Sequence, residues 1–120
     1  MTSTIGANDQ VALQVNIGQT LSFTVTRQNF DGTAKDVTGG TYTAKIRPTY
    51  ESSTVIATLV CTIASPPSAG LVGCVLSATA SGSLTDYVGT RGVWDIREQS
   101  GGTLQILTGG PVTFRQVATR

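Results

Sequence analysis

Apolar side chains recur at every second position through most of the chain, which is the period of a strand with one buried face. Tyr42, Ala44 and Ile46 alternate with polar residues until Pro48, which has no N–H to donate to a neighbouring strand. A second apolar run follows over residues 55–63. The pattern therefore predicts two strands separated by a loop that begins at the proline.

The same alternation appears elsewhere, between clusters of Gly, Pro, Asn and Asp that favour turns. It predicts further strands over residues 11–17, 21–27, 71–76, 92–98, 103–107 and 111–117. Trp94 and Ile96 share one side of their strand, so Trp94 is expected to be the largest side chain of the core. The small residues of 77–82 predict one helical turn, and Gly109 and Gly110 are interpreted as a break between the last two strands.

Short strands with turn signals about every ten residues, and no long helix, are typical of an all-β fold. We expect an immunoglobulin-like antiparallel β-sandwich of seven to eight short strands. A length of 120 residues suits one domain. We assign residues 1–10 to an N-terminal arm, residues 11–117 to the sandwich domain and residues 118–120 to a C-terminal tail.

Charged residues make up 12% of the chain, about half of the roughly 25% that is usual, and the net charge is +1. No run of either sign occurs, so we expect neither a nucleic acid nor a membrane surface as a partner. The N-terminus lacks the pattern of a secretory signal, which predicts synthesis in a cytosol. A weakly charged surface suits a subunit that packs against neighbours.

The chain contains no histidine, the commonest general base and metal ligand. Asp86, Asp95 and Glu98 are close in sequence and would on paper allow a two-carboxylate mechanism. In a regular strand, however, Asp95 and Glu98 face opposite sides, and Asp95 with Arg97 is better interpreted as a solvated pair. We therefore predict no enzyme activity, no catalytic residues, no cofactor and no metal.

Cys61 and Cys74 are the only cysteines. They lie nearly symmetrically about a turn near Pro67, so their side chains are predicted to be cross-strand neighbours in one hairpin. A buried thiol pair is the favoured interpretation because a cytosol keeps thiols reduced, and a disulfide is the alternative. Two further ligands for a zinc ion are missing at suitable spacing.

The run over 55–63 is apolar on both faces, which a strand open to water on one side does not require. Ile56 and Val60 are predicted to share its outer face, and leaving them exposed would forgo about 1.5–3 kcal/mol each. A neighbouring subunit or the N-terminal arm, whose sizeable apolar residue is Ile5, would cover them. Tyr50, in a loop, is the aromatic residue least committed to the core. Ile5, Tyr50, Ile56 and Val60 are thus the candidate residues of a protein interface.

The segment over 36–47, DVTGGTYTAKIR, follows the pattern D-(I/V)-T-G-x-T-(Y/F)-x-A-x-I-R. With residues 21–25, 52–58 and 92–96, it resembles small β-sandwich proteins of tailed bacteriophages. These include the N-terminal module of baseplate upper proteins, which attach receptor-binding fibres, and short neck and tail proteins. The resemblance covers about residues 21–117.

The resemblance implies a virion structural protein, made in the host bacterial cytoplasm and present in many copies on a symmetric ring. Its partners would be other virion proteins: tail, neck, baseplate or fibre subunits. A capsid cement or decoration protein is the alternative within this class. From other classes, a carbohydrate-binding module would need exposed aromatic residues on one face, and a glycosidase would need paired carboxylates in a cleft.

Overall fold

The computed structural model describes residues 2–6, 11–29 and 31–116. The described part contains eight strands and three short helical segments. The strands are β1 (Thr2–Gly6), β2 (Leu13–Asn16), β3 (Leu21–Thr26), β4 (Thr41–Arg47), β5 (Ala57–Ile63), β6 (Leu71–Leu76), β7 (Arg91–Ser100) and β8 (Thr103–Arg115). The helical segments, all three of which lie between β5 and β7, are η1 (Pro67–Ala69), α1 (Ala78–Gly82) and η2 (Thr85–Tyr87).

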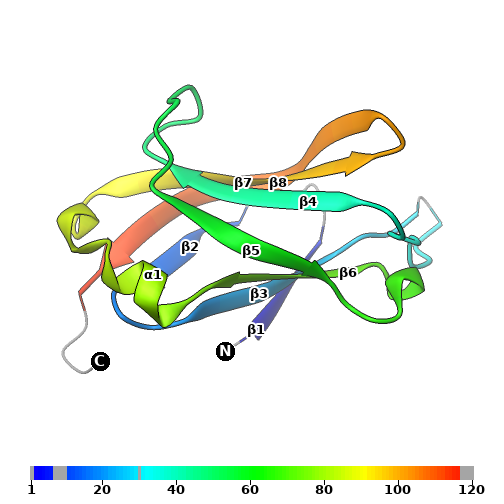
Figure 1. Cartoon of the computed structure of the whole chain (residues 1–120), viewed down its shortest axis with the longest axis horizontal. Coiled ribbons are helices and arrows are strands. Elements are labelled where there is room, and N and C mark those ends of the chain that lie inside the picture. The colour runs from blue at the N-terminus through cyan, green and yellow to red at the C-terminus, as the bar shows by residue number, and fades with distance from the viewer. Residues whose placement is uncertain (1, 7–10, 30, 117–120) are drawn as a thin grey trace.

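The strands are hydrogen-bonded in the order β1-β3-β6-β5-β4-β7-β8-β2 and form two packed layers, as Figure 1 shows. The sheet bends from one layer into the other within β5, because residues 57–59 pair with β4 whereas residues 60–63 pair with β6. One layer is therefore β1-β3-β6-β5, and the other is β4-β7-β8-β2. This arrangement is the predicted immunoglobulin-like β-sandwich.

The N-terminal part of the chain contributes an edge strand to each layer. β1 pairs with β3 and β2 pairs with β8, both in parallel, while the other registered pairs are antiparallel. The sequence predicted no strand within residues 1–10, yet Thr2–Gly6 forms β1. Its Thr, Ser and Gly residues carry little apolar periodicity, so the interstrand hydrogen bonds of its backbone leave no signal in the sequence. Residues 7–10 and the predicted tail 118–120 lie outside the described residues.

The core lies between the layers and is centred on Trp94, which is fully buried, as is Ile96. Phe23 of β3 meets the indole edge-on, with 5.2 Å between the ring centroids, and this contact joins the two layers. The indole Nε1–H donates to the carbonyl of Val11 at 2.8 Å. The predicted inward stripe of β7 is thus confirmed.

The predicted helical turn is α1, which begins after Ser77. The Ser77 hydroxyl accepts a hydrogen bond from the backbone N–H of Ala80 at 3.1 Å, as an N-cap residue does. Ser81 is buried, and its hydroxyl donates to the carbonyl of Gln19 at 2.7 Å. The turn is therefore attached to the loop between β2 and β3.

β8 is one long strand, and the predicted break at Gly109 and Gly110 is wrong. Both glycines pair with β7, opposite Asp95 and Trp94. A Cβ on Gly110 would clash with the Val11 carbonyl oxygen, and one on Gly109 would clash with the Trp94 carbonyl oxygen. These glycines permit the close approach of neighbouring backbone segments and do not form a turn.

Candidate interaction surfaces

The clearest exposed apolar pair lies on the outside of β5 and β6. Val60 is 66% exposed and stands in register with Val75, which is also exposed. The outward positions of β3, β6 and β5 around them carry no charged side chain. These positions are Ser22, Thr24, Thr26, Gly73, Val75, Thr58, Val60 and Thr62. We call this surface the neutral face.

Ile56 does not join Val60 on that face, and this part of the sequence prediction is wrong. The alternation of β5 begins at Ala57, and Ile56 precedes it in a bend. Its backbone N–H donates to the carbonyl of Ile46 at 2.7 Å, and its side chain is half-buried against the core. A two-residue period can be extrapolated only while the strand continues.

The other two candidate residues lie elsewhere. Ile5 belongs to β1, in register with Val25, and the strands β3 and β6 separate it from Val60. Tyr50 follows β4 and is 54% exposed. The four candidates therefore do not form one site.

Tyr50 lines a shallow surface hollow that is open to solvent. Its other lining residues come from β4 and β7: Lys45, Arg47, Val93, Trp94 and Asp95. Among the described aromatic residues only Tyr50 is exposed. The row of exposed aromatics that a carbohydrate-binding face needs is thus not formed by the part of the chain that the structure describes.

A second exposed apolar pair lies on the opposite layer, and sequence reasoning missed it. Leu104 and Ile106, near the β7–β8 turn seen in orange in Figure 1, are each 60% exposed. Leu104 lies four residues and Ile106 two residues before the buried Thr108, so an unbroken two-residue period would turn both side chains towards the core. A register shift between Ile96 and Arg97 leaves Leu107 as the extra residue, turning Leu107 inward and Ile106 outward.

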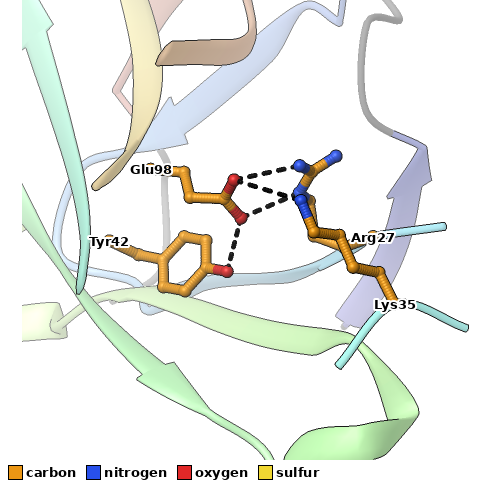
Figure 2. Close-up of polar contacts among 4 residues, drawn as sticks. All are labelled: Arg27, Lys35, Tyr42 and Glu98. Atoms are coloured by element: carbon orange, nitrogen blue, oxygen red, sulfur yellow. Dashed lines mark hydrogen bonds and ion pairs between the residues drawn. The ribbon is translucent and has the colours of Figure 1, made fainter. Parts of the chain in front are cut away.

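The main buried polar cluster is drawn in Figure 2 and lies between the layers, near the start of the loop after β3. Glu98 of β7 is 4% exposed and Arg27 is 7% exposed. The Arg27 guanidinium donates from Nε and Nη2 to the two Glu98 carboxylate oxygens, each at 2.9 Å. The Tyr42 hydroxyl donates to Glu98 Oε2 at 2.6 Å, and Lys35 Nζ lies 3.8 Å from Oε1.

Electrostatics in this cluster favour an ionised Glu98 and a neutral Tyr42. Hydrogen bonding to Arg27 holds the pKa of Glu98 below its ordinary value of 4.5, although burial opposes that shift. Burial and the bond to Glu98 raise the pKa of Tyr42 above its ordinary value. Each Glu98 carboxylate oxygen accepts a hydrogen bond from Arg27, and Oε2 accepts a second from Tyr42, so the cluster joins the two layers through a buried charged hydrogen-bond network.

The sequence held a signal for this cluster. Glu98 is in phase with Trp94 and Ile96, and Arg27 is in phase with Phe23 and Val25. A charge at the end of each inward stripe predicts a buried ion pair, since lone buried charges are costly. From the sequence we predicted only that Glu98 and Asp95 face opposite sides of their strand. Asp95 does lie on the outward side of β7.

The two cysteines are cross-strand neighbours, as predicted. Cys61 of β5 and Cys74 of β6 are partners in register, and their Sγ atoms are 3.7 Å apart. Both are free thiols in this structure. Cys74 is fully buried, whereas Cys61 is partly exposed.

Within the described residues, no group of three or more His, Cys, Asp or Glu side chains is arranged to hold a metal ion. No helix in the same part of the chain is long and apolar enough to span a membrane.

Comparison with known proteins leaves the family open. No family model matches the chain, and a search of curated proteins finds no relative. Among solved structures, the extracellular fragment of novel immune-type receptor 11 from Ictalurus punctatus, including its stalk region, is similar at 12% sequence identity. The match covers 94% of this chain and 90% of that chain, with a TM-score of 0.43. The fold assignment rests on the strand order and not on this likeness.

Proposed function

We propose that this chain is a non-enzymatic structural protein of a tailed-bacteriophage virion. As a component of the tail, neck or baseplate, it binds other virion proteins or attaches fibres. The observation that carries the proposal is the exposed Val60–Val75 pair on the neutral face. Two β-branched apolar side chains among uncharged neighbours favour burial against another protein surface.

The family resemblance supports the virion as the setting. The residues that carry it, 36–47, form the last part of the loop before β4 and β4 itself. They include Tyr42, Ala44 and Ile46, the buried side chains of β4, so the spacing of this pattern is explained by packing in the core of the sandwich. The resemblance therefore supports a shared scaffold, and the partner contact belongs to the outer surfaces.

The position of the exposed pairs supports a ring of many copies. Val60 and Val75 lie on one layer, whereas Leu104 and Ile106 lie on the other. A contact that used both pairs would join unlike surfaces of successive subunits. Contacts of this head-to-tail kind close into rings when the rotation between neighbours allows it.

The proposal is tested by changing Val60 to Asp in the phage that encodes the protein. We expect normal folding of the isolated domain and loss of the protein from purified particles, because a charge on the neutral face opposes burial. Val60→Thr, which keeps the branched shape, and Thr113→Asp, on an exposed position of β8, are the matched controls and should be incorporated.

Full incorporation of Val60→Asp would contradict the assigned surface. Absence of the wild-type protein from particles, or a strict monomer that binds oligosaccharides, would overturn the virion role itself. Separation of tails from filled capsids, and the position of the gene beside tail or capsid genes, distinguish the tail component from a capsid cement protein.

A further inference from the structure

The cysteine pair has the geometry that a disulfide needs. Residues in register on neighbouring antiparallel strands have Cα atoms about 4.5–5.5 Å apart, within the roughly 4.4–6.8 Å found across disulfides. Cys61 and Cys74 occupy such positions, and both side chains are on the core side of their strands. The Sγ atoms already approach to 3.7 Å, so rotation of the side chains is enough to bring them into bonding distance.

The two thiols differ in the way that a stepwise oxidation requires. Cys61 is partly exposed at the place where β5 passes from one layer to the other, whereas Cys74 is fully buried. The hydrogen bond between the thiols lowers the pKa of Cys61 and raises that of Cys74. The thiol that solvent can reach is thus also the one that ionises more readily.

We propose that Cys61 and Cys74 form a modification site, at which a small-molecule disulfide oxidises the thiol pair to an intrachain bond between β5 and β6. The Cys61 thiolate attacks one sulfur of the small disulfide and expels a thiolate. Cys74 then loses its proton and attacks the Cys61 sulfur of the mixed disulfide, expelling the second thiolate. Two protein thiols are oxidised, and one disulfide is reduced to two thiols that take up the two protons.

The bond would secure the exposed apolar surface. Val60 precedes Cys61 and Val75 follows Cys74, so both exposed valines are chain neighbours of the cysteines, with their side chains on the opposite face of the strands. Fixing the cysteines holds this pair in register. The chemistry does not rest on the proposed virion role, although a particle that leaves a reducing cytosol would meet the oxidant after assembly.

The test treats the reduced, folded full chain with oxidised glutathione and then alkylates the remaining thiols before mass spectrometry. We expect the wild type to lose both alkylation sites without retaining glutathione, and its Tm to rise by about 10 °C. Cys74→Ala should stop at a stable glutathione adduct on Cys61. Cys61→Ala should stay unmodified because Cys74 is buried.

Two outcomes overturn the proposal: both thiols still alkylated after oxidation, or disulfides formed between chains. If either variant fails to fold, peptide mapping of the oxidised wild type decides alone, because the proposal requires one peptide pair joined through Cys61 and Cys74. None of these readouts depends on particle assembly, so their failure is distinguishable from failure of the proposed function.

Discussion

Two contacts join the layers of the sandwich, an apolar one between β3 and β7 and a polar one between β7 and the residue that follows β3. Phe23 meets Trp94 in the core, and Arg27 meets Glu98 four residues further along each segment, which is about 13 Å away. The first contact gains its stability from burial and is indifferent to pH. The second depends on the charge of Glu98 and on every one of its donors.

The two contacts lose stability for different reasons when a side chain is removed. Removing an aromatic side chain leaves a cavity, whose cost grows with its volume. Removing one member of the polar cluster leaves the remaining groups buried with fewer partners, whereas replacing the whole cluster by apolar residues is expected to cost little. We therefore expect the polar contact to contribute more to the alignment of the layers than to their stability.

The largest effect is expected for Trp94→Ala. The free energy of unfolding should fall by about 3–5 kcal/mol, because the change opens a cavity and removes the donor to the Val11 carbonyl. Urea denaturation measures this. Tyr50→Ala, at an exposed aromatic residue, is the control and should stay within about 0.5 kcal/mol of the wild type. A loss at Trp94 no larger than at Tyr50 would contradict the assigned core.

Arg27→Met comes next and should cost about 3 kcal/mol, because it leaves the buried Glu98 carboxylate with Tyr42 and the more distant Lys35. The double variant Arg27→Met/Glu98→Leu should recover most of this loss and lie within about 1 kcal/mol of the wild type. Denaturant titration of the single and double variants checks it. Additive losses in the double variant would show that the pair itself stabilises the fold.

Tyr42→Phe should cost less, about 1.5 kcal/mol, since the ring stays and one hydrogen bond to a charged acceptor is lost. The pKa of Glu98 should rise towards its ordinary value, because that bond helps to lower it. Thermal unfolding and NMR titration of the Glu98 carboxyl measure the two effects. An unchanged Glu98 pKa would mean that the hydroxyl does not donate to the carboxylate.

The smallest effect concerns acid. Because the folded-state pKa of Glu98 lies below its ordinary 4.5, its contribution is complete above pH 4.5 and is lost as the pH falls through the folded value. The Tm of the wild type should therefore fall more below pH 4.5 than that of the Arg27→Met/Glu98→Leu variant. Asp31 and Asp36 also have lowered pKa values but are present in both chains, so the difference isolates Glu98. Parallel acid profiles would contradict the assignment.

Local alternation predicted the parts of the fold in which a strand stays regular. The inward stripe of β4, the stripe through Trp94 and the helical turn after Ser77 follow from side chains a few residues apart. The misses have non-local causes. The phase of Ile106 depends on a bulge opposite Ile96. Gly110 is required by the close approach of the Val11 backbone, and Gly109 by that of the Trp94 carbonyl.

The candidate site was predicted less well, for a related reason. Val60 is exposed as its phase requires, but Val75 stands beside it only because β5 and β6 pair in one particular register. Ile56 is four residues before Val60 and would share its face in a continuous strand. β5 begins only at Ala57, so the Ile56 side chain does not lie on that face. Whether an apolar residue is exposed depends on the residues that surround it in space, and most of these are remote in sequence.

The parallel pairing of β2 with β8 has a mechanical consequence. If the chain is pulled from the start of β2 and the end of β8, these neighbouring parallel strands are forced to slide in opposite directions. The four registered pairs from Leu13↔Val112 to Asn16↔Arg115 would then share the load together, whereas an antiparallel hairpin would open one pair at a time. Single-molecule pulling between anchors at Leu13 and Arg115 should therefore register a high force for rupture of the β2–β8 pairing.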